Sequence, residues 1–280
     1  MDINYSEFEK VFRPIAENCG CTQWGLCPFS AVSDSLLECR KKELLPADSK
    51  TVICVLFPYM LESYGESRNI SRYAVPEDYH LVLGRLLSDM CQKLKDKFSG
   101  CEFVSFADNS PIPEVKASAF SGLGVVGKNS LLINKTYGSW VFIGEIVTDI
   151  NVKDMSFTNV IEHCIGCNKC IKSCPVNAIS ENGGIDREKC LSAVTQRKGE
   201  LTESEVKAIL KSGCIWGCDI CQEVCPMNSQ IKILPLEEFT KNCVFALMEE
   251  TGIKKRAFGW RGRGVINRNL EIISDKNNGK

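Results

Sequence analysis

The feature that most constrains this chain is a set of eight cysteines that begins at Cys164 and ends at Cys225, while a ninth cysteine in this range, Cys214, lies outside the spacing pattern. The first four stand in the run Cys-Ile-Gly-Cys-Asn-Lys-Cys-Ile-Lys-Ser-Cys-Pro, which begins at Cys164 and ends at Pro175. This C-x2-C-x2-C-x3-C-P spacing is typical of bacterial proteins that hold 4Fe–4S clusters. Cys190 and a second group, from Cys218 to Pro226, complete the set. Eight thiolates are the number that two such clusters need.

The spacing also predicts which cysteines share a cluster. A short loop can bring closely spaced thiolates to one cluster, while the cysteine before the proline binds the neighbouring cluster. We therefore expect one cluster on Cys164, Cys167, Cys170 and Cys225, and the other on Cys174, Cys190, Cys218 and Cys221. The alternatives are structural zinc, with four ligands per site, and disulfide bonds. Zinc sites seldom combine three cysteines at two-residue gaps with a Cys-Pro pair, so the pattern favours iron–sulfur clusters.

Composition and charge limit the class of protein. A chain of 280 residues with 44% hydrophobic residues can form one large domain, or one domain and a smaller module. The net charge of −1 argues against overall attraction to nucleic acid but leaves room for a local basic patch. The N-terminus is polar and acidic, unlike a signal peptide, and no apolar run reaches membrane-spanning length. We therefore expect a cytoplasmic protein with reduced thiols, and no membrane partner.

Hydrophobic periodicity predicts the elements around the cysteines. Apolar spacing indicates helices at residues 4–18, 76–97, 111–120 and 236–250, strands at 51–57 and 101–107, and a hairpin joining 131–133 to 140–147. The predicted fold class is α+β. We divide it into a mixed α/β domain (1–155), a bacterial ferredoxin-like module for two 4Fe–4S clusters (156–235), and a helical segment with a basic tail (236–280).

Three polar stretches in the first domain are candidates for binding: residues 72–80, 107–111 and 122–130. The third is rich in glycine but follows a predicted helix rather than a strand, so a dinucleotide-binding reading has little weight. Its backbone N–H groups could still bind an anionic or amide-rich ligand. Asp108, taken alone, suits a turn or a helix cap, and His80 an ordinary helix position.

Taken together, these stretches resemble the epoxyqueuosine reductases, cobalamin-dependent iron–sulfur enzymes of tRNA queuosine synthesis. The likeness covers nearly the whole chain, and this family is related in architecture to the reductive dehalogenases. The matching pieces are Arg72-Tyr73-Ala74, Asp78-Tyr79-His80, Asp108 with Pro111 and Glu114, the stretch from Gly122 to Asn129, Gly138-Ser139-Trp140, the first cysteine run, Cys190-Leu191-Ser192, and Gly217 to Pro226.

The resemblance implies a function. Residues 1–155 would be a cobalamin-binding catalytic domain of the reductive-dehalogenase kind, and electrons would reach cobalamin through the two clusters. The epoxide on the cyclopentane ring of the modified base would become an alkene with loss of water. Asp108 matches the proposed proton donor. The expected cofactor-binding residues are Tyr79, His80 and Asp108 near the corrin, and Lys128, Asn129, Ser139 and Trp140 in its surrounding loops. The implied partners are tRNA and a small-protein or chemical electron donor, with the chain acting as a monomer.

Two departures from the family concern substrate recognition. Family members commonly continue into a helical-repeat region that helps to hold tRNA, whereas this sequence stops at Lys280, and residues 193–197 differ from the usual Tyr-Leu-Thr-Ile-Glu-like stretch. A basic tail with Phe258 and Trp260 suits phosphate contacts and base stacking. Its candidate nucleic-acid contacts are Lys254, Lys255, Arg256, Arg261 and Arg263. The tail could equally be a solvated terminus or pack on acidic parts of its own chain.

Two other functions remain open on the sequence alone. One is a cobalamin-dependent reductase of a small molecule, and the other is a two-cluster electron carrier whose first domain only docks a partner.

Overall fold

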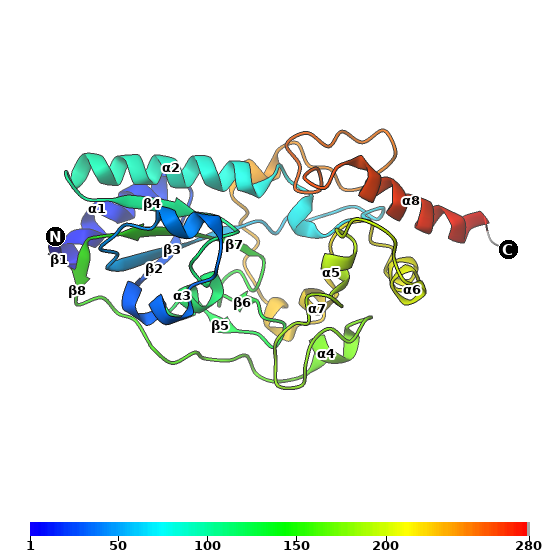
Figure 1. Cartoon of the computed structure of the whole chain (residues 1–280), viewed down its shortest axis with the longest axis horizontal. Coiled ribbons are helices and arrows are strands. Elements are labelled where there is room, and N and C mark those ends of the chain that lie inside the picture. Colours follow the sequence, from blue (N-terminus) through cyan, green and yellow to red (C-terminus); the bar gives the residue numbers. More distant parts are fainter. Residues whose placement is uncertain (279–280) are drawn as a thin grey trace. The chain divides into compact units, whose positions relative to one another are not determined.

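The computed structural model describes residues 1–278 and forms two compact units. The sheet unit comprises Met1–Pro58, His80–Val126 and Leu131–Cys164. The cluster unit comprises Tyr59–Tyr79, Gly127–Ser130 and the described chain from Ile165 onward. Each unit is thus assembled from separate segments of the sequence, whose elements are labelled in Figure 1. The predicted boundaries after residues 155 and 235 stay a prediction.

The core of the sheet unit is a four-stranded antiparallel sheet. Its strands are β2 (Gln23–Pro28), β3 (Thr51–Pro58), β7 (Val141–Thr148) and β4 (Phe103–Phe106), in the order β2-β3-β7-β4. Every residue of β3 is buried, as its continuous apolar run predicts for a strand covered on both faces. The strands predicted at 51–57 and 101–107 are therefore confirmed.

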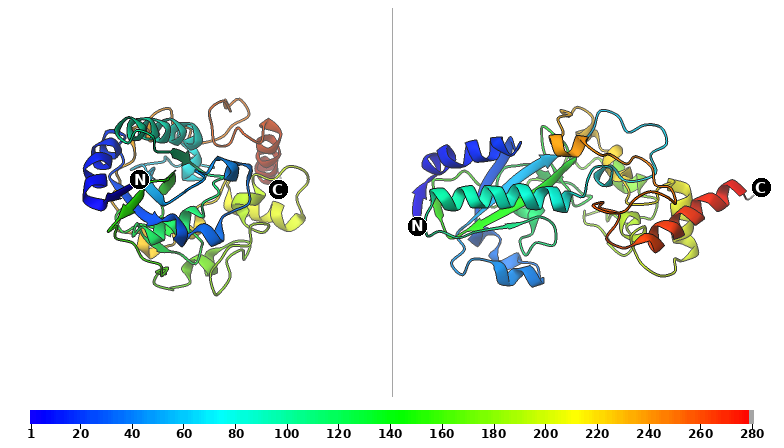
Figure 2. Two further views of the ribbon diagram at one scale, coloured as in Figure 1. Left: turned by 60° about the vertical axis from the view of Figure 1, so that its left-hand side comes forward. Right: turned by 90° about the horizontal axis from the view of Figure 1, so that it is seen from above.

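Helices cover both faces of this sheet (Figures 1 and 2). Cys54 of β3 and Val147 of β7 lie on the face toward α3 (Glu114–Phe120) and belong to its apolar cluster. On the other face lie α1 (Tyr5–Asn18) and α2 (Tyr79–Lys97). Gly144 of β7 lacks a side chain where Leu87 of α2 packs. The helices predicted at 4–18, 76–97 and 111–120 are confirmed.

The predicted hairpin between residues 131–133 and 140–147 is wrong. β6 (Leu132–Ile133) pairs with β5 (Val125–Val126), whereas β7 pairs with β3 and β4. The turn is present but redirects the chain, because Asn134 accepts hydrogen bonds from the amides of Thr136 (2.8 Å) and Tyr137 (3.0 Å) and donates one to the Leu123 carbonyl (2.7 Å). A further two-stranded pair joins β1 (Asp2–Asn4) and β8 (Asn151–Lys153) in parallel.

Short helices and loops form the cluster unit. Its helices are α4 (Lys169–Ser173), α5 (Leu191–Val194), α6 (Glu203–Ser212), α7 (Ile220–Glu223) and α8 (Arg263–Asn278). A capping box between Thr202 and Glu205 starts α6, and Gly213, at φ +68°, ends it. One apolar cluster centres on Trp216 and Phe258. A second packs α5 and α6 against Ile272 and Ile273 of α8.

The helix predicted at 236–250 is wrong, since that stretch contains only a short 3-10 turn, Glu237–Thr240. Asn242 adopts a left-handed backbone at φ +52°. The amides beyond it bond outside the stretch, that of Val244 to the Val75 carbonyl (2.9 Å) and that of Leu247 to Asn69 Oδ1 (2.8 Å). Local helical spacing of apolar residues therefore gives way to these longer-range bonds.

The remaining elements are single 3-10 turns. They are η1 (Phe29–Ala31), η2 (Ser33–Ser35), η3 (Arg40–Leu44), η4 (Arg72–Ala74), η5 (Pro226–Asn228) and η6 (Glu237–Thr240). No helix within residues 1–278 is both long enough and apolar enough to cross a membrane.

Candidate active site and cluster-binding loops

Asp108 lies on a strained turn just beyond β4. Both Asp108 (φ +52°) and Asn109 (φ +41°) adopt the left-handed backbone, which is uncommon outside glycine although aspartate and asparagine tolerate it best. The backbone amide of Asn109 donates to Asp108 Oδ1 at 2.7 Å, and Lys41 Nζ donates to the Asp108 carbonyl at 3.3 Å. Strained polar turns of this kind are concentrated at functional sites.

His80 binds the second oxygen of this carboxyl. Its Nε2 lies 3.0 Å from Asp108 Oδ2, so both carboxyl oxygens are engaged. The His80 and Asp108 side chains remain 43% and 55% exposed. The structure therefore brings two of the predicted site residues together, oriented and still accessible to a ligand, which is what a proton donor requires.

Two further carboxyls, those of Glu114 and Glu145, interact electrostatically with Asp108. Glu114 is the first residue of α3, and burial, followed by the negative charge of Asp108, raises its pKa to about 7. Glu145 lies in the middle of β7 with 0% exposure, and burial, followed by the charge of Glu114, raises its pKa well above the usual range. The sequence reasoning quoted Glu114 only as part of the resemblance and missed Glu145. A lone glutamate inside an otherwise apolar strand was the available signal.

The other predicted corrin contacts of the sheet unit are Ser139 and Trp140, immediately before β7. Both are buried, at 5% and 3% exposure. The hydroxyl of Tyr137, two residues before Ser139, shares a hydrogen bond with Thr22 Oγ1 at 2.9 Å. These two residues are therefore part of a packed loop.

Tyr79 belongs to the cluster unit and meets Tyr73 edge-on, with ring centroids 6.2 Å apart. The Tyr73 hydroxyl accepts hydrogen bonds from Trp216 Nε1 (2.9 Å) and Gln196 Nε2 (3.2 Å). Tyr79 thus lies beside an aromatic group that is itself fixed by the core of the cluster unit.

Lys128 and Asn129 contact the cysteine loops. Lys128 Nζ donates to Asn168 Oδ1 (2.7 Å) and to the Glu181 carbonyl (2.8 Å), and Asn168 lies inside the first cysteine run. Asn129 Nδ2 donates to Cys221 Sγ at 3.7 Å. Sequence reasoning missed these contacts with the cluster loops, and a role of either residue in corrin binding stays a prediction.

The glycine-rich stretch at 122–130 offers a ligand fewer free amides than expected. The amides of Gly122, Leu123, Val126 and Ser130 all donate to carbonyls of the chain itself. The stretch does follow a helix, as predicted, with Gly122 at φ +74° after α3. These four N–H groups therefore cannot also bind an anion.

The predicted cluster ligands gather around Cys221. Burial is the main cause of a rise in the pKa of the Cys221 thiol to about 12. The hydrogen bond from Asn129 lowers this pKa, whereas the nearby Cys190, Cys170 and Cys174 raise it further. A bound metal reverses this effect, because a coordinating thiol is deprotonated. α4 and α7, which carry cysteines of the two groups, pack together. The donor set therefore fits a thiolate-bound cluster, while the assignment of each cysteine to one cluster stays a prediction.

Cys164 is the last residue of the sheet unit, and the other predicted ligands belong to the cluster unit. Within residues 1–278, no three Cys, His, Asp or Glu side chains converge closely enough to hold one metal ion. A four-iron cluster has a different geometry, since each thiolate binds a different iron.

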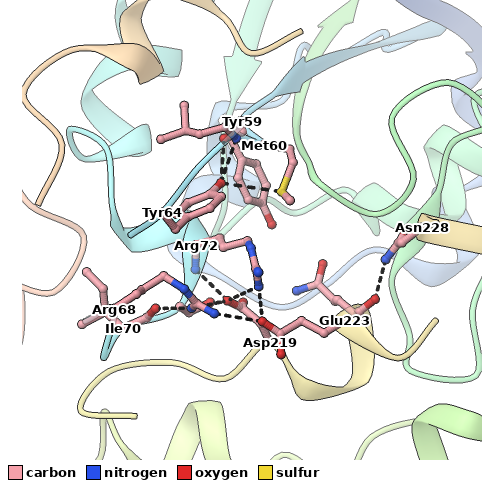
Figure 3. A network of polar contacts seen from close by, with 12 residues as sticks. Tyr59, Met60, Tyr64, Arg68, Ile70, Arg72, Asp219, Glu223 and Asn228 are labelled. Atoms are coloured by element: carbon pink, nitrogen blue, oxygen red, sulfur yellow. Dashed lines mark hydrogen bonds and ion pairs between the residues drawn. The ribbon is translucent and has the colours of Figure 1, made fainter. Parts of the chain in front are cut away.

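Asp219, between two predicted ligands, anchors their loop through a buried ionic network (Figure 3). It is 3% exposed, accepts from the Arg72 amide at 2.8 Å and from Ser71 Oγ, and pairs with Arg68 Nη1 at 2.9 Å. Arg68 and Arg72 also bind Glu223. Burial raises the pKa of Asp219, and these partners offset part of that rise. Sequence reasoning did not connect the polar stretch at 72–80 with the cysteine loop.

Gly217 allows the same loop to approach residue 71. Its φ is +74°, and a Cβ there would clash with the Ser71 side chain. Only glycine meets both conditions at low cost.

The basic tail divides into exposed and structural side chains. Lys254 and Lys255 are exposed, and the Arg261 guanidinium lies 3.6 Å from the ring centroid of Trp260, which is 60% exposed. Arg256 and Arg263 are partly buried, and Arg263 donates to the carbonyls of Glu249 and Thr251. The expectation that Phe258 stacks on a base is wrong, since its side chain is fully buried in the core.

Comparison with known proteins adds an independent observation. Residues 163–228 match the family model of a 4Fe-4S double cluster binding domain, and residues 39–109 match that of epoxyqueuosine reductase QueG, DUF1730. The epoxyqueuosine reductase of Aliivibrio fischeri is 32% identical over 269 residues, an alignment that covers 85% of this chain and 71% of that protein. The predicted iron–sulfur clusters are thereby confirmed.

Solved structures share the fold. A crystal structure of epoxyqueuosine reductase with an epoxyqueuosine-modified tRNA-Tyr stem loop matches with a TM-score of 0.80 and 23% identity, over 96% of this chain and 81% of that one. The catabolic reductive dehalogenase NpRdhA matches with a TM-score of 0.53 and 17% identity, over 95% of this chain and 36% of that one. The predicted fold class, with its likeness to reductive dehalogenases, is confirmed.

Proposed function

Since the chain belongs to the epoxyqueuosine reductase family, we propose that it reduces epoxyqueuosine to queuosine in the anticodon loop of tRNA. The observation that carries this proposal is the oriented Asp108 carboxyl, held by His80 and the Asn109 amide in a chain that also carries a two-cluster module. The oxygen of an epoxide is a poor leaving group unless it is protonated. A fixed and accessible carboxyl is suited to that step.

Electrons would enter through the two clusters, with the eight cysteines as ligands in the two sets predicted above. Asn129 would donate a hydrogen bond to the sulfur of one ligand, Cys221. Asp219 and its arginines would hold the loop on which this ligand lies. Hydrogen bonds to cluster sulfurs are among the factors that set reduction potential.

We assign cobalamin as the second cofactor, which when bound supplies a strongly reducing centre for opening the epoxide. His80 and Asp108 are accessible and polar, and this suits contact with a bound corrin or substrate. Ser139 and Trp140 are buried, so they would shape the surrounding loop by packing. The other residues predicted to bind cobalamin, Tyr79, Lys128 and Asn129, belong to the cluster unit.

The proposed substrate is tRNA rather than a free nucleoside. A related structure, named above, contains an epoxyqueuosine-modified tRNA stem loop. In this chain Lys254, Lys255 and Arg261 offer exposed or partly exposed charges, and the exposed Trp260 offers a ring on which a base can stack. We further infer a cytoplasmic monomer that receives electrons from a small protein or a chemical donor.

The proposal is tested with anaerobically reconstituted protein, cob(II)alamin, a chemical reductant and tRNA that carries epoxyqueuosine. Mass spectrometry of the digested tRNA should show queuosine. Reduction of the free nucleoside but not of the tRNA would indicate a small-molecule reductase. Reduced clusters with no product, and an unperturbed cobalamin signal in electron paramagnetic resonance, would indicate an electron carrier.

The tRNA contact is tested by salt dependence. Each lost phosphate contact should lower the slope of log affinity against log salt by about 1. Lys254→Ala and Arg261→Ala should lower it, whereas the control Lys207→Ala, on the exposed face of α6, should not. Equal slopes in all variants would remove the tail from the interface.

A further inference from the structure

The clusters of the proposed enzyme must be reloaded with electrons from outside the chain. Conversion of an epoxide to an alkene and water consumes two electrons, and a 4Fe–4S cluster delivers one electron at a time. A donor must therefore reach a cluster again in every turnover, and electron transfer is fast only over a short distance. This requirement rests on the function proposed above.

Cys167 is the most accessible of the eight predicted ligands. Its residue is exposed, whereas those of the other seven are partly buried. The preceding residue, Gly166, adopts a left-handed backbone at φ +69°, and a side chain added there would meet open space. The cluster expected on Cys167 therefore has its most accessible edge at this loop.

Ile165 gives the same loop an apolar side chain that faces water. It is 67% exposed, the largest exposed fraction among the large apolar residues that the structure describes. A single exposed apolar residue needs no explanation by itself. This one lies two positions from the most accessible predicted ligand, where its burial against a partner would remove apolar surface from water and favour binding.

Two lysines make the surface beside this loop positive. Lys169 and Lys172 are both exposed, and they are three residues apart on α4, so their side chains lie on one face of that helix. Among the described side chains, no carboxylate forms an ion pair with either lysine. The sequence contains no acidic residue between Glu162 and Glu181. The two charges are therefore available to a partner.

Contacts within the cluster unit hold the loop in place. Lys128 Nζ donates to Asn168 Oδ1 at 2.7 Å and to the Glu181 carbonyl at 2.8 Å. Lys128 thereby adds a third positive charge near the loop, against the one negative charge of Glu181. A surface that is already ordered loses little conformational freedom on binding, which favours association.

We propose that Ile165, Cys167, Lys169 and Lys172 form a donor surface, on which a small acidic electron-transfer protein docks. Acidic residues of the partner face the two lysines, and the edge of its cofactor lies against Ile165. The lysines also offset the negative charge of a thiolate-bound cluster, which would otherwise repel an acidic partner. At each encounter one electron passes from the reduced partner to an oxidised cluster and no covalent bond changes, so two encounters supply the two electrons that the epoxide needs.

Binding tests the two lysines independently of turnover. Isothermal titration calorimetry uses the reconstituted whole chain, without tRNA, and oxidised flavodoxin as an acidic probe. The double variant Lys169→Glu with Lys172→Glu should bind about tenfold to a hundredfold more weakly at low salt, and the difference should shrink as salt rises. The control Lys207→Glu reverses an exposed lysine of α6 and should bind like the wild type. Wild-type affinity of the double variant at low salt would overturn the proposal.

The apolar part of the donor surface has its own matched pair of variants. Ile165→Ala should weaken flavodoxin binding about tenfold, at low and at high salt alike, because it removes apolar surface that the partner covers. The control Met248→Ala shortens another apolar side chain of the same unit, 54% exposed, and should leave the affinity unchanged. Equal affinities of Ile165→Ala and Met248→Ala would contradict the proposed contact.

Electron transfer supplies the second readout. In stopped flow, flavodoxin hydroquinone loses one electron to a cluster and becomes the semiquinone, whose absorbance is followed. The lysine double variant should react about tenfold or more slowly at low salt, while reduction by light and deazaflavin, a small uncharged route, keeps its wild-type rate. Equal slowing by both routes would place the effect in the clusters and count against docking. Should this variant lose iron, Lys169→Gln with Lys172→Gln and the separate Ile165→Ala decide.

The proposed function and the donor surface fail separately in these experiments. Neither measurement uses tRNA, so a chain that does not reduce epoxyqueuosine can still show the donor surface. Loss of the donor surface, in turn, leaves the proposed reaction testable with a chemical reductant.

Discussion

Nε2 of His80, the second residue of α2, lies 3.0 Å from Oδ2 of Asp108, although 28 positions separate them in sequence. The amide of Asn109 binds the other oxygen. The carboxyl is therefore fixed from two sides on a left-handed turn while its side chain stays more than half exposed. The carboxyl that we propose as proton donor is thus preorganised by the next residue of its own turn and by a residue of α2.

His80 is expected to position Asp108. His80→Phe removes the hydrogen bond and should lower kcat about tenfold to a hundredfold, because a misplaced donor no longer reaches the leaving oxygen. His80→Gln keeps a polar nitrogen at similar reach and should recover much of this loss. Steady-state kinetics with iron content measured in parallel checks the prediction. Equal activity in His80→Phe and wild type would show that the contact is dispensable.

Asp219 is expected to hold the second cysteine loop. Asp219→Asn leaves Arg68 and Arg72 without their buried counter-charge, and breaking such a pair costs about 3–5 kcal/mol. Iron content should fall from about eight to about four atoms per chain, because the loop of Cys218 and Cys221 loses its anchor. Asp186→Asn, at an exposed pair with Lys189, serves as the control. Full iron content in Asp219→Asn would contradict this role.

Asn129 is expected to raise the potential of the neighbouring cluster. Its amide donates toward Cys221 Sγ, and such donors stabilise the more negative, reduced cluster. Asn129→Ala should therefore shift one of the two potentials to a more negative value and leave the other in place. A redox titration followed by electron paramagnetic resonance measures this, with the exposed Asn18→Ala as control. Unchanged potentials in both variants would separate Asn129 from the clusters.

Glu114 is expected to make stability fall as pH rises. Its folded-state pKa of about 7 lies above the ordinary value of 4.5, so the folded chain binds the proton more tightly than the unfolded chain. This contribution is fully present below pH 4.5 and is lost as pH rises through about 7. The loss amounts to about 1–3 kcal/mol for a partly exposed group. Thermal unfolding from pH 5 to pH 8 should show it in the wild type and in the control Glu102→Gln, which changes an exposed glutamate of the same unit, and less of it in Glu114→Gln. An identical pH dependence in Glu114→Gln would contradict the raised pKa.

The parts of the fold that the sequence predicts are those set by local pattern. The continuous apolar run at 51–57 predicted a buried strand, and the spacing of eight cysteines favoured a module for iron–sulfur clusters. Patterns failed where distant groups decide the structure. Asn134 turns the chain at the expected hairpin, and bonds to Asn69 and Val75 replace the expected helix at 236–250.

The candidate site, like the fold, was predicted only in part from local sequence patterns. Asp108 and His80 were assigned a role in the site only through the resemblance, since nothing in their local sequence distinguishes them from ordinary turn and helix residues. Their contact depends on how α2 and the turn after β4 pack in the sheet unit. For Phe258 the local pattern was misleading. Its basic neighbours predicted an exposed ring that could stack on a base, whereas the ring is buried in the core with Trp216.

The measurement that tests the central claim most directly is nucleoside mass spectrometry of epoxyqueuosine-containing tRNA after incubation with wild type and with Asp108→Asn. Both proteins should contain about eight irons and give the same cobalamin signal in electron paramagnetic resonance. The wild type should form queuosine, and Asp108→Asn should form it about 10²- to 10⁴-fold more slowly. Queuosine formation at the wild-type rate in Asp108→Asn would remove Asp108 from the reaction. No queuosine from a fully loaded wild type would contradict the assignment of the reaction itself.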